Sequence, residues 1–277
     1  IYKGDIELGR DVVVGGDVTV KTGSGDITMG KRGAAGVEVH TVTSTGGSID
    51  IETGKGNISI GHNAANDPTI VAEKNVTLYA KEGIITVDGK TETKQGDITV
   101  HAHNEDPAAG DNIVILHNGI LDSGRDLTLH TYNGGIEVTD STLAKRNIKI
   151  IVDNQGDITF GRDINVVGDV SVETGNGNIS VAKKVKSQQG SVDILTKKGN
   201  ILIGDNGPDV ETVAAYKDVS LQAESGKIEV YGKTYAQTGD VTLLAGTDAY
   251  IAGEAGKNII IDHNGQIASG QDATLIA

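Results

Sequence analysis

Short runs of alternating aliphatic and polar residues recur along the whole chain, each directly after a glycine and a small polar residue. Examples are Gly4-Asp5-Ile6-Glu7-Leu8, Gly96-Asp97-Ile98-Thr99-Val100 and Gly239-Asp240-Val241. An aliphatic-polar-aliphatic triplet is typical of a strand that buries one face. Glycine can occupy a turn position with φ > 0, and the short side chain of Asp or Asn can hydrogen-bond the turn backbone. Each phrase therefore predicts one corner followed by one short strand.

The spacing of these phrases predicts an all-β solenoid of parallel strands. With one phrase counted per coil, the corner residues are 5, 26, 48, 75, 97, 126, 147, 169, 191, 218 and 240. The base period is about 22 residues, which lies within the range of solenoids. A further triplet follows many phrases, as at Ile58-Ser59-Ile60, so each coil should hold at least two strands. We therefore predict a parallel β-helix (β-solenoid) of about twelve coils that forms one domain over residues 1–277.

A longer repeat indicates a tandem duplication. Residues 4–30 align with residues 156–182 at an offset of 152, with 15 of 27 positions identical. Further along the chain the offset falls to 143 and then becomes 146. We therefore expect two copies, at about 1–140 and 153–277. The first change of offset means that Lys31 to Gly46 holds nine residues more than its counterpart, Lys183 to Gln189, and such extra length should lie at the surface.

An antiparallel meander is the competing fold, because Lys21-Thr22-Gly23-Ser24-Gly25 could close a hairpin. Composition argues against it. The chain has no Trp, one Phe and seven Tyr, whereas a sandwich needs bulky residues to fill roughly 10 Å between its sheets. The narrow lumen of a solenoid can be filled by stacked Val, Ile and Leu.

Charge and composition exclude several classes of function. The 38 acidic and 24 basic residues give a net charge of −14, which opposes binding to nucleic acid or to anionic membrane surfaces. No apolar stretch approaches the roughly 18 residues that span a bilayer, so we expect no membrane insertion, and no stretch has the pattern of a signal peptide. The absence of Cys excludes disulfides and thiolate metal sites. Because the sequence begins and ends inside repeat phrases, we expect it to be a piece of a longer chain.

The repeat phrases resemble those of filamentous haemagglutinin-like proteins, the large adhesins of two-partner secretion. The residues that carry the resemblance are Gly25-Asp26-Ile27-Thr28-Met29, Gly156-Asp157-Ile158-Thr159-Phe160 and Gly168-Asp169-Val170-Ser171-Val172. The resemblance implies a right-handed β-helical shaft that a dedicated outer-membrane transporter exports to the bacterial surface or medium. The family's secretion domain usually carries Asn-Pro motifs. This chain has no Asn-Pro dipeptide, so that domain would lie upstream of Ile1.

The acidic residues are spread along the chain rather than clustered. Turn capping at one repeated corner explains many of them without chemistry. We expect at this corner Asp5, Asp26, Asp97, Asp126, Asp169, Asp218 and Asp240, with Ser48, Asn75, Asn147 and Ser191 in other coils. We therefore predict no catalytic residue, no cofactor and no metal. A polysaccharide-active β-helix enzyme, a lyase or hydrolase, is the alternative, and it would need at least two convergent carboxylates from a single coil in a lateral groove.

Two residue pairs are weighed as candidate sites. His101 and His103 look most like metal ligands because alternate strand residues share a face, but an exposed polar strand end is the favoured interpretation. Tyr231 and Tyr235 could stack on sugar rings, but edge packing on the sheet is favoured. At the matching positions of the first copy stand Asp88 and Glu92.

From these observations we expect a rigid shaft segment of a secreted or cell-surface bacterial adhesin. It would mediate attachment, or present a distal binding or effector domain, rather than catalyse a reaction. Its partners would be a host or bacterial cell-surface glycan or protein, together with the export transporter. The best candidate for partner binding is Lys31 to Gly46, which contains a run from Val37 to Val42 that could form an extra strand. A purely structural insertion is the simpler explanation of that segment, and a self-associating filament is a third possibility.

Overall fold

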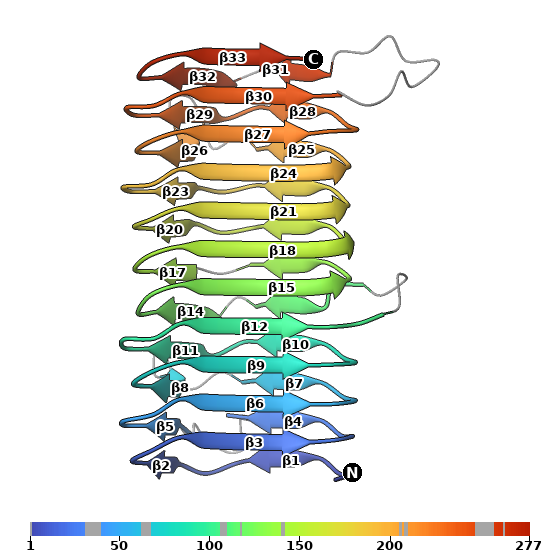
Figure 1. The fold of residues 1–277 in the computed structure, drawn as a ribbon, viewed down its shortest axis with the longest axis vertical. Helices are drawn as coiled ribbons and strands as arrows, with labels where there is room; N and C mark the ends of the chain where they lie inside the picture. Colours follow the sequence, from blue (N-terminus) through green and yellow to red (C-terminus); the bar gives the residue numbers. More distant parts are fainter. Residues whose placement is uncertain are drawn as a thin grey trace.

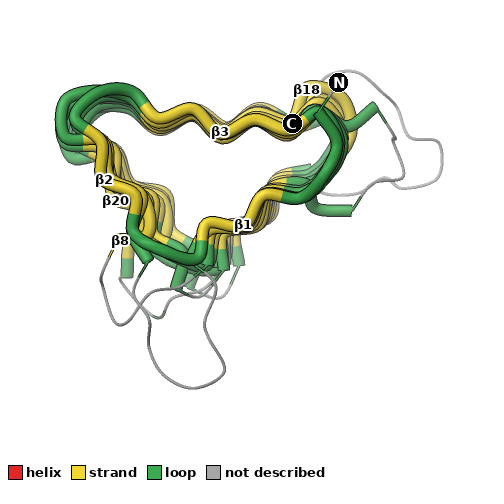
Figure 2. The backbone as a smooth tube through the Cα atoms, turned by 90° about the horizontal axis from the view of Figure 1, so that it is seen from below, coloured by secondary structure: helices red, strands yellow, loops and turns green. Residues whose placement is uncertain are grey.

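The chain folds as an all-β parallel solenoid, in which three long sheets run side by side along the axis (Figure 1). The computed structural model describes residues 2–30, 40–61, 68–105, 110–116, 118–139, 142–204, 207, 210–246, 258–262 and 264–277. Viewed along the axis, the coils superpose on a three-sided outline with one sheet on each side (Figure 2). No helix occurs in these ranges.

Each sheet contains eleven parallel strands in the described ranges, and each strand pairs with the strand three places away along the chain. The first sheet consists of β1 (Ile6–Leu8), β4 (Ile27–Met29), β7 (Ile58–Ile60), β10 (Ile85–Val87), β13 (Ile113–Ile115), β16 (Ile136–Val138), β19 (Ile158–Phe160), β22 (Ile179–Val181), β25 (Ile201–Ile203), β28 (Ile228–Val230) and β31 (Ile259–Ile261).

The second sheet consists of β2 (Val12–Val14), β5 (Val42–Ser44), β8 (Pro68–Ala72), β11 (Lys90–Thr93), β14 (Ile120–Ser123), β17 (Thr142–Ala144), β20 (Ile164–Val166), β23 (Val185–Ser187), β26 (Glu211–Ala215), β29 (Lys233–Ala236) and β32 (Gln266–Ser269).

The third sheet consists of β3 (Val18–Thr22), β6 (Ile49–Thr53), β9 (Val76–Ala80), β12 (Ile98–Ala102), β15 (Leu127–Asn133), β18 (Ile148–Gln155), β21 (Val170–Asn176), β24 (Val192–Lys198), β27 (Val219–Ala223), β30 (Val241–Ala245) and β33 (Ala273–Ile276).

The core is a stack of aliphatic rows that run along the axis. In the first sheet the first residue of every strand is isoleucine, and the register places each of these on its counterpart in the next coil. Ile27, Ile58, Ile85 and Ile113 are fully buried members of this row. Phe160 is also fully buried, between Val138 and Val181. The alternation in the sequence therefore corresponds to residues that point alternately into the lumen and out to solvent.

The coil contains three strands, and the recurring phrase marks two different corners. Asp5 and Asp26 precede strands of the first sheet, whereas Asp97 precedes a strand of the third sheet. The prediction that all these residues lie at one repeated corner is therefore wrong for Asp5 and Asp26. The two corners use the same turn chemistry, so the sequence does not distinguish them. The expected count is about twelve coils, and each sheet holds eleven strands in the described ranges.

Small polar side chains at these corners join successive coils. Before the third sheet, each side-chain oxygen accepts a hydrogen bond of 2.8–3.4 Å from the backbone N–H of the matching residue in the next coil. The accepting residues are Asp17, Ser48, Asn75, Asp97, Asp126, Asn147, Asp169, Ser191, Asp218 and Asp240, and the last donor in the row is the N–H of Asp272. A structural role for these residues is confirmed, with the partner in the neighbouring coil rather than in the same turn.

The corner glycines are required for two different reasons. Gly25 and Gly56, before the first sheet, have φ of 142° and 141°, which L side chains rarely adopt. Gly96, before the third sheet, has no positive φ, but a Cβ there would collide with the backbone of Lys74 in the preceding coil. Turn geometry and close stacking thus act together at Gly25 and Gly56, where a Cβ would also collide with the backbone of the preceding coil, whereas close stacking alone explains Gly96.

Matching segments of the two expected copies lie in the same sheet, although the sequence offset between the copies changes along the chain. The segment of β1 aligns with β19, that of β10 with β28 and that of β14 with β32. In each case the displacement is six strands within the same sheet. Each described strand from β1 to β15 therefore has a structural counterpart among β19 to β33, which supplies matched substitutions for experiments.

We expect small-angle X-ray scattering to show an elongated particle. With eleven strands per sheet and about 4.8 Å between neighbouring strands, the stack is about 50 Å long. A pair-distance distribution with the symmetric profile of a globular protein of this mass would contradict the solenoid.

Candidate functional site

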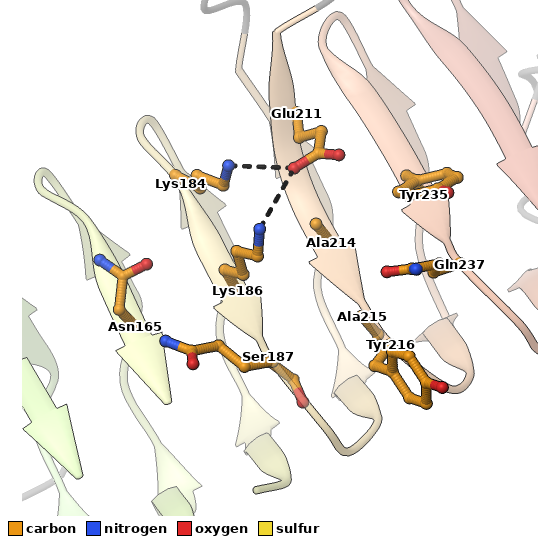
Figure 3. Close-up of a pocket in the computed structure, with 11 residues that line it drawn as sticks. Asn165, Lys184, Lys186, Ser187, Glu211, Ala214, Ala215, Tyr216, Tyr235 and Gln237 are labelled. Atoms are coloured by element: carbon orange, nitrogen blue, oxygen red, sulfur yellow. Dashed lines mark hydrogen bonds and ion pairs between the residues drawn. The ribbon is translucent and has the colours of Figure 1, made fainter. Parts of the chain in front are cut away.

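The outer face of the second sheet carries a hollow of about 480 Å³ that several coils form together (Figure 3). Its lining residues are Asn165, Lys184, Lys186, Ser187, Gln188, Glu211, Ala214, Ala215, Tyr216, Tyr235 and Gln237. They come from β20, β23, β26 and β29 and from residues that directly precede or follow these strands. Sequence analysis predicted no site residues, so this surface is a finding of the structure.

The hollow exists because a small residue lies between two large ones in one outward row. The register places Lys186 of β23, Ala214 of β26 and Tyr235 of β29 on neighbouring strands. Ala214 is buried at the base, while Lys186 and Tyr235 lie on either side of it (Figure 3). An alanine methyl group leaves most of the space between the two longer side chains empty.

The counterpart row in the first copy carries different side chains. It consists of Thr43 of β5, Val71 of β8 and Glu92 of β11. Glu92 and Asp122 both pair with Lys90, at 2.7 and 3.6 Å. The second copy therefore differs from the first in shape and in charge at the same place in the coil.

Lysines outnumber carboxylates at one end of the hollow. Glu211 Oε2 lies 3.0 Å from Lys184 Nζ and 4.0 Å from Lys186 Nζ (Figure 3). Partial burial alone would raise the pKa of Glu211. The hydrogen bond and charge of Lys184, together with the charges of Lys186 and Lys233, outweigh that effect and hold the pKa below its ordinary value. Glu211 is therefore ionised at neutral pH, and three ammonium groups share its single negative charge.

Two tyrosines flank the other part of the hollow. Tyr235 lies beneath Lys233, whose Nζ is 5.2 Å from the ring centroid, and Tyr216 is 42% exposed. Tyr231 lies elsewhere, after β28 of the first sheet, where its hydroxyl donates to Glu229 at 3.3 Å. The structure thus separates the sequence candidates Tyr231 and Tyr235 and places Tyr216 near Tyr235 instead. Only the coil register brings Tyr216 to this surface, so no motif could have indicated it.

His101 and His103 both lie on the outer face of the third sheet, but they pack against aromatic neighbours. The His101 ring stacks on His130 at a centroid distance of 4.5 Å and lies 5.0 Å from the ring of Tyr79, which is tilted by 46°. His103 stacks on Tyr132 at 4.9 Å. His130 Nε2 lies 2.7 Å from Asp153 Oδ2. Among the described residues, no group of three or more His, Cys, Asp or Glu side chains is placed to hold a metal ion.

His101 is held in its neutral form. Its Nε2 is buried without a hydrogen-bond partner. Burial, followed by the charges of His130 and His103, lowers its pKa from 6.5 to about 4, although Asp153 opposes the shift. An unfolded chain therefore binds this proton below about pH 6.5, whereas the folded chain does so only below about pH 4. Folding stability should fall as the pH decreases across this window.

We expect His101→Leu to remove this part of the acid sensitivity. Leu244 occupies the same place in the second copy, so the substitution suits the sheet. The full shift corresponds to about 3 kcal/mol, and solvent screening at a half-buried ring reduces it to about 1–2 kcal/mol. Thermal unfolding of both proteins at pH 7 and pH 4.5 measures the effect. An equal loss of stability in the two proteins would show that His101 does not cause it.

Two carboxylates of a single coil, the arrangement that the enzymatic alternative requires, line a hollow of about 480 Å³ on the third sheet. They are Asp50 and Glu52 of β6, and Lys21 Nζ lies 2.7 Å from Glu52 Oε2. Another hollow, of about 420 Å³, contains Asp111 and Asp157. Partial burial and the charge of Asp157 raise the pKa of Asp111. Asp111 precedes β13 and Asp157 precedes β19, so the two belong to different coils. The pair therefore differs from the single-coil arrangement that the alternative requires.

Most of the segment proposed for partner binding lies outside the described residues. The structure describes residues 40–46 of Lys31 to Gly46, and of the run from Val37 to Val42 it describes His40 to Val42. Val42 begins β5, an ordinary member of the second sheet that pairs with β2 and β8. In its described part, the run thus contributes to a regular strand rather than to an extra one.

Comparison with family models, curated proteins and solved structures finds no match to this chain. Among the described residues, no helix is long and apolar enough to cross a membrane.

Proposed function

We propose that this chain is a rigid shaft segment of a large secreted or cell-surface bacterial adhesin. The observation that carries the proposal is the continuity of the stack, because the three sheets extend through all described coils around one aliphatic core. Such a repeat array keeps its shape over distance, since every coil is held by its neighbours. A shaft can mediate attachment through its sides or present a distal binding or effector domain.

The finer parts of this proposal come from the resemblance of the repeat phrases. They are the right-handed coil, export through an outer-membrane transporter, and location at the bacterial surface or in the medium. The partner would be a glycan or protein of a host or bacterial cell surface. The net charge of −14 favours such partners over nucleic acid or anionic membranes.

A binding and cleavage assay tests the proposal against the enzymatic alternative. The isolated chain is applied to a glycan array and to intact epithelial and bacterial cells, and each bound glycan is then incubated with it. A shaft with an adhesive surface should bind without shortening the glycan. A new reducing end or an unsaturated sugar product would instead establish a lyase or hydrolase.

Replacing Lys31 to Gly46 with Lys183 to Gln189 should keep the fold and, on the hypothesis that this segment is the contact site, abolish binding to the surface that the unmodified chain recognises. The inserted residues contain β23, which holds the same place in the second sheet as β5, so the coil can close as it does in the second copy. Circular dichroism and the same cell-binding assay measure the two effects. Full binding by a folded exchange variant would exclude this segment as the contact site.

A further inference from the structure

The hollow on the second sheet has the features of a ligand site that the repeat architecture alone does not require. Its volume of about 480 Å³ lies within the usual range of ligand sites, about 300–1,000 Å³. The first copy places Thr43, Val71 and Glu92 in the same row and keeps the same strand pairing. The shaft can therefore be built with other side chains in this row, and the residues that create the hollow need a separate explanation.

The groups around the hollow are complementary to an acidic sugar. Lys184 and Lys186 can donate charge-assisted hydrogen bonds to a carboxylate, and the side-chain amides of Asn165 and Gln237 can bind hydroxyl groups (Figure 3). Tyrosine rings offer apolar surface to the C–H groups of a sugar and a hydroxyl for hydrogen bonding. The lining thus offers one kind of partner for each of three features of a carboxylated sugar: ammonium groups for the carboxylate, amides for the hydroxyl groups and aromatic rings for the C–H groups.

The electrostatic balance favours a carboxylate over a neutral sugar. Lys184, Lys186 and Lys233 all act on Glu211, which is the one carboxylate in the lining. The surrounding protein carries a net charge of −14, which disfavours densely charged polyanions such as nucleic acids. A glycan with isolated carboxylates combines local attraction to the lysines with weaker repulsion from the rest of the shaft.

We propose that this hollow binds a carboxylated sugar residue of a surface glycan, with Lys186 and Lys184 on the carboxylate and Tyr235 and Tyr216 beside the sugar ring. This inference rests on the proposed adhesive shaft and adds a lateral binding site to it. The site lies in the second copy of the repeat.

Calorimetric titration with acidic and neutral oligosaccharides tests the site. The acidic probes are trigalacturonate and 3′-sialyllactose, and the neutral controls are the methyl ester of trigalacturonate and lactose. We expect at least one acidic probe to bind at least tenfold more tightly than its neutral control. Absence of binding by both acidic probes, or equal binding of each acid and its neutral control, overturns the proposal.

Variants with residues from the first copy locate the binding. Lys186→Thr, Tyr235→Glu and Ala214→Val install the residues found at Thr43, Glu92 and Val71, so each suits the strand it enters. Each should weaken binding of the acidic probe at least tenfold while the melting temperature stays within a few degrees. Lys149→Thr, which removes the same charge from an exposed position on β18 of the third sheet, should leave affinity unchanged within twofold.

The outcomes separate this site from the proposed function. Equal weakening by Lys186→Thr and Lys149→Thr would show that binding depends on general charge attraction, which overturns the site. Unchanged affinity in Lys186→Thr would also overturn it. Neither result changes the elongated particle or its attachment to cells, on which the adhesive shaft depends. Cleavage of trigalacturonate would overturn the shaft proposal, while loss of affinity in the three variants would still establish the hollow as the binding site.

Discussion

Ile98→Asp should destabilise the solenoid by more than about 4 kcal/mol, the largest effect we expect from a single substitution. Ile98 is fully buried and its register neighbours are Val76 in the preceding coil and Leu127 in the following one. An aspartate there would bring an unpaired carboxylate into an aliphatic row. Because each coil is held by its neighbours, the damage should reach the coils on both sides.

Thr99→Asp is the matched control for this substitution. Thr99 is the next residue of β12 and points outward, between Thr77 and Thr128 in its row. The same new charge at a solvent-facing position should change stability by only about 0.5 kcal/mol. Urea denaturation measures both variants, and hydrogen exchange shows how far the damage extends. Equal losses would mean that the inward and outward faces of β12 are assigned wrongly.

The sequence predicted the strands well because each strand carries its own evidence. In Gly96-Asp97-Ile98-Thr99-Val100 the glycine, the capping aspartate and the alternating side chains all indicate a corner and a strand, and the structure places β12 there. The failure was in counting corners. The corner before the first sheet uses the same phrase as the corner before the third, as in Gly25-Asp26-Ile27. The local sequence therefore does not tell which of the two sheets the following strand joins.

The hollow could not be predicted because it depends on contacts between coils. Lys186, Ala214 and Tyr235 are separated by 28 and 21 residues and meet only through the register of three strands. That register follows from coil length, which varies where extra residues enter at a corner. Ala214 by itself looks like any small strand residue, and its importance lies in the size of its two neighbours.

Deletion of residues 147–168 should shorten the shaft by one coil and leave it folded. The new junction joins Arg146 to Asp169, which takes the corner place of Asn147. Its backbone N–H can donate to Asp126 Oδ1 as that of Asn147 does, and its carboxylate already accepts from the N–H of Ser191. β15 would then pair with β21. The bulge that β18 introduces against both strands would be lost, because the spacing of Thr131 and Asn133 equals that of Thr174 and Asn176.

Deletion of residues 147–157, half of the same segment, should instead prevent folding. It joins Arg146 to Ile158, so that β19 would enter the third sheet and every later strand would fall on the wrong side of the coil. A short strand such as β19 cannot replace the longer β18, and the corner residues would lose their partners. The comparison separates the effect of register from that of lost residues, because the smaller deletion is the more damaging.

Circular dichroism and thermal unfolding should show a cooperative β protein for the whole-coil deletion and an unfolded chain for the half-coil deletion. Scattering should show the folded variant shorter by about 4.8 Å. A shaft tolerates this change because its function depends on length and stiffness, whereas a catalytic groove built across these coils would lose its geometry. Unfolding of both deletion variants would show that the coils are not interchangeable units, which would remove the physical basis for treating the chain as a spacer of adjustable length.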